Sequence, residues 1–226
     1  MKRLICLVAF SLAAAGSAAA LDLTSITFHD SMLFLDSAQV LDGNGHPTSA
    51  ASPILDALGA SFDLKLSDLF LFEPSLDIYG TYYKWLPDQN RAVPAELENR
   101  EAFVLGFILD TSFYIRWAIA DRLQLQFGLG PAFILPAGFI GVQENDQTTQ
   151  AGIVADVKSI NGWFYSEGRF VRPSATLSFR FKLRDKIDFG VWGRVIVPIY
   201  HWWANDGLPF TDNLIGNAGV LASILL

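Results

Sequence analysis

Apolar residues alternate with polar or small residues from Phe103 to Leu135, and the alternation keeps one parity across the charged pair Asp121-Arg122. A period of two is typical of a β-strand that has one apolar face. The apolar positions are Phe103, Leu105, Phe107, Leu109, Phe113, Ile115, Trp117, Ile119, Leu123, Leu125, Phe127, Leu129, Phe133 and Leu135. Strands of soluble sheets usually have about 5–6 residues, whereas a strand that crosses a membrane on a tilted path needs about 9–11. The segment therefore predicts a membrane-crossing hairpin.

The N-terminus has the three parts of a secretory signal peptide over residues 1–20. A basic start precedes an apolar run over residues 4–15, and Ala18–Ala20 form a small-residue cleavage site. We expect Sec-dependent export and a mature chain of one domain, residues 21–226. Because the single cysteine, Cys6, lies within the signal, disulfides, thiol catalysis and cysteine-bound metals are excluded from the mature chain.

The composition is apolar, with 51% hydrophobic residues, and acidic, with a net charge of −7. After the signal, no run of about 18 apolar residues predicts a transmembrane helix. An exported chain that enters lipid without helices can satisfy its backbone groups only as a closed barrel. The acidic balance argues against binding to nucleic acid or to anionic lipid surfaces.

Short turns alternate with long polar segments along the chain. Three loops of three residues with a central Asp are expected at 67–69, 120–122 and 184–186. Long solvated loops are expected at 36–53, 86–100, 137–167 and 204–212. This alternation is typical of outer-membrane barrels, whose long loops face away from the cell.

Eight strands lie between these loops, which predicts an all-β fold, an eight-stranded antiparallel transmembrane β-barrel in an up-and-down meander. The expected strands are 21–35, 54–66, 70–85, 101–119, 123–136, 168–183, 187–203 and 213–226. In the first strand the apolar parity slips, so a bulge is expected there and its register is left open.

The final strand places Ala218, Val220, Ala222, Ile224 and Leu226 on alternate positions. It is similar to the C-terminal signal that barrel assembly machinery reads in the small eight-stranded outer-membrane barrels, although their last residue is usually Phe. The whole mature chain resembles this group, which contains OmpX, OmpW and the membrane domain of OmpA, and its size and loop pattern are most similar to OmpW. The resemblance implies the outer membrane of a diderm bacterium, with membrane lipid and the assembly machinery as partners.

Charged residues gather on the parity that faces the barrel interior. They are Asp63, Lys65, Asp77, Asp110, Arg116, Arg172, Arg180, Lys182, Asp188 and Arg194. An eight-stranded barrel has an interior just wide enough for side chains to fill, so one interpretation is an ion-paired plug. The other is a narrow charged path for small solutes.

Aromatic residues also fall on inward positions, mostly toward the long-loop end. They are Tyr79, Tyr83, Trp85, Trp192, Tyr200 and Trp202. If the chain resembles OmpW, these side chains could form the mouth of an apolar pocket for small hydrophobic compounds. The alternative is an interfacial girdle, because Trp and Tyr concentrate at bilayer surfaces.

Catalysis is not expected. One class of small barrels, the palmitoyl-transferring enzymes, uses a loop His with Asp and Ser, and His46 lies near Asp42 and Ser49. Closeness in sequence alone does not make an activated nucleophile. The chain also has no hydrolase, zinc-protease, P-loop or dinucleotide motif, and the acidic loops lack calcium-loop spacing. We expect no cofactor and no metal.

The function predicted from the sequence is an outer-membrane envelope component that passes or binds small molecules, hydrophobic ones among them. One alternative is a surface adhesin or interaction protein that binds a host or surface ligand through its long loops. Another is a periplasmic ligand carrier shaped like a lipocalin. A wide porin is disfavoured, because aqueous channels have about sixteen strands.

Overall fold

The computed structural model describes residues 22–37, 53–95, 100–141, 149–204 and 208–226. Its strands are β1 (Asp22–Leu35), β2 (Ile54–Lys65), β3 (Phe70–Leu86), β4 (Arg91–Pro94), β5 (Ala102–Ala120), β6 (Leu123–Gly141), β7 (Val171–Arg184), β8 (Ile187–Ile196) and β9 (Ile215–Leu225). Its helices are the 3-10 turn η1 (Pro87–Gln89), α2 (Gln150–Tyr165) and α3 (His201–Ala204). No helix in the described ranges has the length and hydropathy to cross a membrane.

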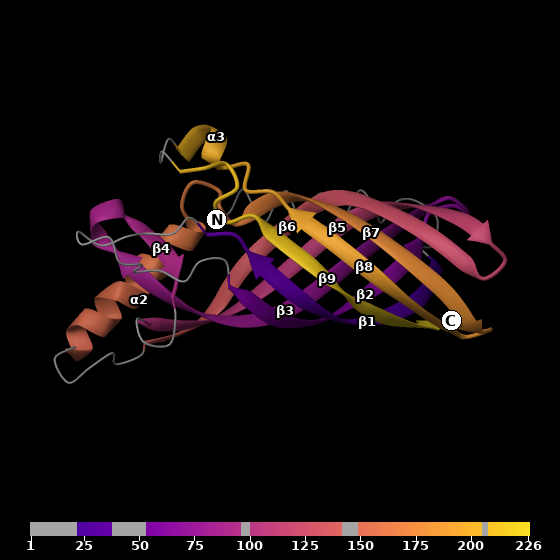
Figure 1. Cartoon of the computed structure of the whole chain (residues 1–226), viewed down its shortest axis with the longest axis horizontal. Coiled ribbons are helices and arrows are strands. Elements are labelled where there is room, and N and C mark those ends of the chain that lie inside the picture. The colour runs from indigo at the N-terminus through magenta and orange to yellow at the C-terminus, as the bar shows by residue number, and fades with distance from the viewer. Residues whose placement is uncertain (1–21, 38–52, 96–99, 142–148, 205–207) are drawn as a thin grey trace.

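Eight of these strands close into a barrel, which confirms the predicted fold (Figure 1). Each strand pairs antiparallel with its neighbours in the ring, and β1 pairs with both β2 and β9 to complete it. Among the described residues the remaining strand, β4, pairs only with the end of β3 and is not part of the ring. Closure leaves the sheet without an edge strand, as a sheet in lipid requires.

The two faces of the wall differ because side chains alternate along each strand. Outward positions are large and apolar, including Phe28, Leu58, Phe113, Leu129 and Val191, which are all exposed. Inward positions of the same strands are buried and mostly polar over much of the barrel length. An exposed apolar surface of this extent is what a membrane-embedded barrel needs.

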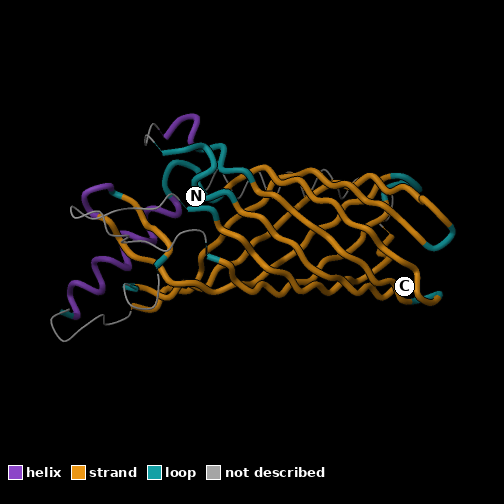
Figure 2. The backbone as a smooth tube through the Cα atoms, viewed as in Figure 1, coloured by secondary structure: helices purple, strands orange, loops and turns teal. Residues whose placement is uncertain are grey.

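The two ends of the barrel are unlike (Figures 1 and 2). We call the end that carries α2, α3 and β4 the mouth, and the end with the short turns and the C-terminus the turn end. The expected three-residue loops are wrong at two of the three turns, where only two residues separate Ala120 from Leu123 and Arg184 from Ile187. At each of these two turns a one-residue bulge lies in the strand just before the turn. The extra residue of the bulge keeps the apolar residues of both strands on one face, which the third loop residue was expected to do.

Two of the segments expected to be solvated loops contain regular structure. Within 86–100 the structure has η1 and β4. Within 137–167, strand β6 runs on to Gly141, and α2 begins after Thr149, whose hydroxyl accepts a hydrogen bond from the Gly152 N–H at 3.2 Å. This contact is an ordinary N-cap.

The helix α2 forms because its sequence has an apolar stripe. Apolar residues stand at helical spacing, namely Ile153, Val157, Ile160 and Phe164. Polar neighbours such as Asp156, Lys158 and Asn161 lie between them and hid the pattern. The prediction of a loop over this segment is therefore wrong.

Strand boundaries near the mouth also need correction. The seventh predicted strand was expected to reach residue 203, but β8 ends at Ile196, shortly before Pro198, which has no N–H to give to a ladder. Trp202, expected to face inward, lies in α3 and is 74% exposed.

At the turn end of the barrel, β1 has its bulge between Leu23 and Ser25. The signal over 1–20 and the His46 group lie outside the described residues.

Candidate functional site: a layered lumen and its mouth

The layer nearest the turn end is built around Arg180 of β7. Its guanidinium donates from Nη1 to Asp63 Oδ2 of β2 at 2.7 Å and from Nη2 to Glu73 Oε2 of β3 at 2.9 Å. Ser61 donates to the other Glu73 oxygen at 2.8 Å. All of these side chains are buried, so one cation holds two carboxylates across the width of the barrel. We call this set the Arg180 layer.

A second layer lies closer to the mouth, around Arg194 of β8. Arg194 Nη2 donates to Asp77 Oδ2, and its Nη1 lies 3.7 Å from Asp110 Oδ2. His29 of β1 places Nε2 3.3 Å from Asp77 Oδ1, and its ring lies 5.0 Å from the ring of Trp192. We call this set the Arg194 layer.

The two layers leave little open space. Between them lies a cavity of about 20 Å³, lined by side chains that include Glu73, Arg180, His29, Trp192 and Arg194. A cavity of this size has room for about one water molecule. In the part of the chain that the structure describes, the arrangement is that of an ion-paired plug rather than a charged path.

Four other predicted lumen residues lie toward the turn end. Lys65 and Lys182 are partly exposed and pair with the turn residues Asp68 at 2.6 Å and Asp185 at 3.7 Å. Arg116 is also partly exposed, and Asp188 is buried. Because solvent screens exposed ion pairs, the two lysine pairs contribute little stability. The hydrogen bond from the Lys65 ammonium holds the pKa of the Asp68 carboxyl below its usual range.

The last predicted charge, Arg172, lies near the mouth and donates to two backbone carbonyls. Its Nε donates to the Arg169 carbonyl at 2.8 Å and its Nη1 to the Asn213 carbonyl at 2.6 Å. Its guanidinium also lies 5.2 Å from the ring centre of Tyr200. Arg172 therefore ties β7 to the segments that lead into β9.

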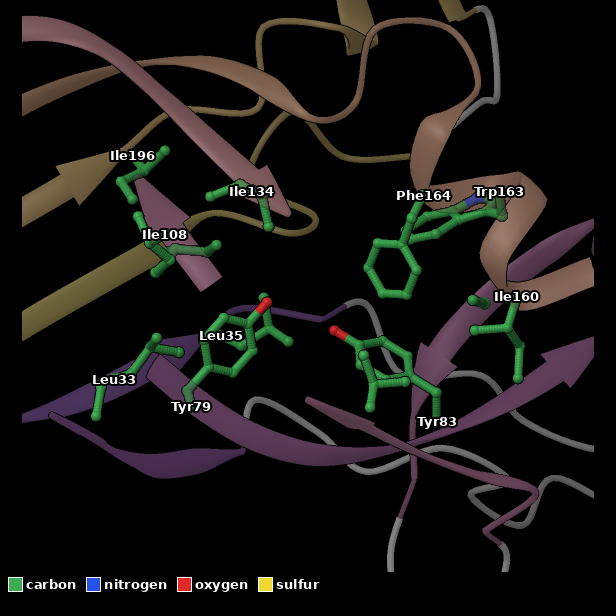
Figure 3. Packing of buried hydrophobic residues seen from close by; sticks show 14 of the residues in the cluster. Leu33, Leu35, Tyr79, Tyr83, Ile108, Ile134, Ile160, Trp163, Phe164 and Ile196 are labelled. Carbon is green, nitrogen blue, oxygen red and sulfur yellow. The ribbon is translucent and has the colours of Figure 1, made fainter. Parts of the chain in front are cut away.

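Beyond Arg172 most buried side chains are apolar, although the ion pair between Arg91 of β4 and Asp212, at 3.4 Å, is also buried at this end. Side chains from most of the strands and from α2 form one buried group, which we call the mouth cluster (Figure 3). Its members include Leu33, Leu35, Tyr79, Tyr83, Val104, Ile108, Ile134, Ile160, Trp163, Phe164, Ile196 and Ile215. Phe164 meets the ring of Tyr83 edge-on at 5.0 Å, so α2 forms a roof over the barrel.

The predicted aromatic residues separate into three groups. Tyr79 and Tyr83 belong to the mouth cluster, and Trp85 packs against it. Trp192 lies deeper, in the Arg194 layer, and Tyr200 is buried beside Arg172. Trp202 lies in α3, outside the barrel, and is exposed.

The roof is fastened at both ends of α2. Near its C-terminus the Tyr165 hydroxyl donates to the Pro136 carbonyl at 2.6 Å. Near its N-terminus Ile153 packs on Gly141 of β6, where a Cβ built on the glycine would lie 3.6 Å from the Cβ of Ile153. Both contacts join α2 to β6, so the helix is held against the barrel at each of its ends.

Below the roof, the seam between β2 and β3 is incomplete. Its ladder begins at Ala57↔Tyr79, although β2 itself starts at Ile54. On β3, pairing on that side resumes with β4 at Tyr83↔Pro94. Between these points the Tyr82 carbonyl accepts a hydrogen bond from the Ala95 N–H at 2.9 Å. Within the described residues, Gly80 and Thr81 have ladder partners only on β5, so the wall beside the mouth cluster is weaker there.

Sequence reasoning missed several of these residues. Glu73 lies on the inward parity of β3 but is followed by Pro74, which obscured the pattern. His29 was missed because the register of β1 was open, and the α2 residues because the segment was expected to be a loop. Among the described residues no cluster of His, Cys, Asp and Glu could hold a metal ion.

The chain matches no protein-family model and no curated protein sequence. It does match solved structures. Neisserial surface protein A is 9% identical, with a TM-score of 0.51 over 92% of this chain and 99% of that one. The fold is that of the small outer-membrane barrels. OprG from Pseudomonas aeruginosa matches at 12% identity and a TM-score of 0.47, over 90% of this chain and 97% of that one.

Proposed function

We propose that this chain is an integral outer-membrane barrel that takes up small apolar molecules at its mouth. The membrane placement is supported by the exposed apolar outer face of the strands, which a soluble lipocalin-like carrier would not need. We expect the mouth to face outward from the cell, since both it and the long segments between strands lie at one end.

The observation that carries the proposal is the mouth cluster. Deeper inward positions are filled by charged and polar side chains, whereas most of the buried positions at the mouth are aliphatic or aromatic. An apolar molecule that replaced the roof residues Trp163 and Phe164 would be surrounded by Tyr79, Tyr83 and Ile134, and would bury its surface there. The cluster is filled in this structure, so binding requires α2 to move away.

The route beyond the cluster is sideways. The Arg194 layer blocks the lumen with buried ion pairs, and desolvation makes it a poor path for an apolar solute. The incomplete β2–β3 seam lies beside Tyr79 and offers an exit into the membrane. Lipid is also the favourable destination for an apolar molecule.

A disulfide that fastens the roof tests this proposal. The double variant Gly141→Cys with Ile153→Cys meets the usual Cβ separation of about 3.5–4.5 Å, and Cys6 lies in the expected signal. Cells that make the oxidised double variant should take up radiolabelled naphthalene no faster than cells without the protein. Reduction should restore the rate.

The controls are Ile153→Cys and Ile153→Ala, which remove the same side chain without forming a bridge within the protein. Both should take up naphthalene at least as fast as the wild type, because the roof is looser. Equal rates for the oxidised and reduced double variant would refute a roof that opens, even with the barrel correctly inserted.

A further inference from the structure

The short helix α3 lies beside the barrel rather than over its lumen. Figure 1 shows it near the level of the mouth and farther from the barrel axis than the wall. Strand β8, whose outward residues Phe189, Val191 and Val195 are exposed, leads through residues 197–200 into this helix. The helix therefore lies next to the edge of the apolar band that faces lipid.

The helix α3 and the segment after it expose large aromatic side chains. Trp202 and Trp203 are 74% and 53% exposed, and Phe210 is 40% exposed. The rings of Trp202 and Phe210 stack, with their centres 5.6 Å apart. We call these three residues the aromatic patch. A large apolar patch on a protein surface usually marks a place that meets a membrane or another molecule.

The rest of the chain holds the aromatic patch in place. Trp203 Nε1 donates a hydrogen bond to the Glu167 carbonyl, in the turn between α2 and β7, at 2.7 Å. On the other side of α3, His201 Nε2 lies 2.7 Å from the Asp212 carbonyl oxygen. Since α3 is fastened to the rim on both sides, the exposure of Trp202 is a property of the fold.

The chemistry of the aromatic patch suits a lipid interface. Residues 200–204 and 208–211 contain no Asp, Glu, Lys or Arg, although the chain as a whole has a net charge of −7. Anionic headgroups would therefore not be repelled there. Among the described residues the indole N–H of Trp202 has no protein acceptor, so it can donate to a headgroup oxygen while the ring contacts acyl chains.

We propose that the aromatic patch inserts into the membrane leaflet at the mouth end, beside the barrel wall. The occupant is lipid because the patch continues the lipid-facing side of β8. Aromatic girdles belong to the wall of a barrel, whereas this contact extends beyond the wall on a helix of its own. The inference needs the barrel to be in a membrane, but it is independent of the roof and of apolar uptake.

A fluorescent label that reports lipid contact tests the placement. Ala204→Cys, at the end of α3, carries a nitrobenzoxadiazole label, and the barrel is refolded into phosphatidylcholine vesicles with acyl chains brominated close to the headgroup. Bromine should quench this label strongly and aqueous iodide only weakly. The matched control is Val154→Cys on α2, which is 58% exposed on a helix that extends away from the mouth and should show the reverse. Equal accessibility to iodide at the two positions would overturn the proposal and leave a soluble partner as the occupant.

Substitution of the aromatic side chains separates lipid insertion from chance position. In the Ala204→Cys background, Trp202→Ser with Phe210→Ser removes the apolar surface, and iodide quenching should rise toward the level of Val154→Cys. Trp202→Phe with Phe210→Leu keeps an apolar surface and should keep the label protected. Loss of protection in both double variants, or in neither, would overturn the proposal. Heat-modifiable migration on a gel reports that each variant is folded.

Discussion

The Arg180 layer allows a quantitative prediction for the substitution Arg180→Met. Methionine fills a similar volume but leaves Asp63 and Glu73 buried without their shared cation. Removal of one partner from a buried ion pair costs about 3–5 kcal/mol. Since two carboxylates lose their partner together, we expect the free energy of unfolding to fall by an amount in the upper half of that range.

The same reasoning predicts a rescue. In the triple variant with Asp63→Asn and Glu73→Gln no charge of the layer remains, and replacement of a whole buried ion group by neutral residues is often close to neutral. The triple variant should therefore be more stable than Arg180→Met alone. Lys182→Met, two positions along β7 on the same parity, is the matched control and should cost less than about 1 kcal/mol because its pair with Asp185 is exposed.

The assay is urea unfolding of the barrel refolded into lipid vesicles, followed by tryptophan fluorescence, and the folding and unfolding curves must coincide. A loss of less than about 1 kcal/mol for Arg180→Met, or a triple variant as unstable as the single one, would refute the view that this cation holds two buried carboxylates.

Two further predictions concern single contacts. Tyr165→Phe removes the hydrogen bond to Pro136 and should loosen α2 by about 1 kcal/mol, seen as faster proteolysis within the helix and unchanged stability of the barrel; equal proteolysis rates would contradict this. Gly190→Ala would press a Cβ against the Phe179 carbonyl oxygen and should destabilise the barrel by about 1–3 kcal/mol in the same urea assay. Gly193→Ala on the same strand meets its nearest atom at 3.4 Å and should be nearly neutral, so equal effects of the two would be a contradiction.

The barrel could be predicted from the sequence because its main signal is local. The alternation of apolar and polar residues along a strand predicts which side chains face inward. It predicted the inward positions of Asp77, Asp110, Arg180 and Arg194 correctly. Which acid meets which base was not predictable, since the partners come from distant strands and depend on the stagger of the closed sheet.

The features that were not predicted from the sequence were missed for identifiable physical reasons. A bulge in β1 shifts the pattern by one residue, which hid His29 among its neighbours. The segment of helix α2 was predicted to be a loop because polar residues stand between the residues of its apolar stripe. The stripe packs against residues at the mouth that come from distant strands, and the local sequence carries no information about them. The end of β8 was set too late because aromatic residues such as Trp202 continue the apolar composition beyond the strand.

The ion pairs of the lumen have an order along the chain. The carboxylates Asp63, Glu73, Asp77 and Asp110 come from β2, β3 and β5, and their arginine partners come from β7 and β8. Before the barrel closes, the carboxylates of these layers therefore lie on the N-terminal strands of the sheet and the arginines on the C-terminal strands. The charges in each half of the open sheet are far from their partners in the other half. The opposite charges meet only when the ring is complete, so these ion pairs favour barrel closure. They also disfavour a barrel that closes with the wrong strand stagger, because the partners would then not meet.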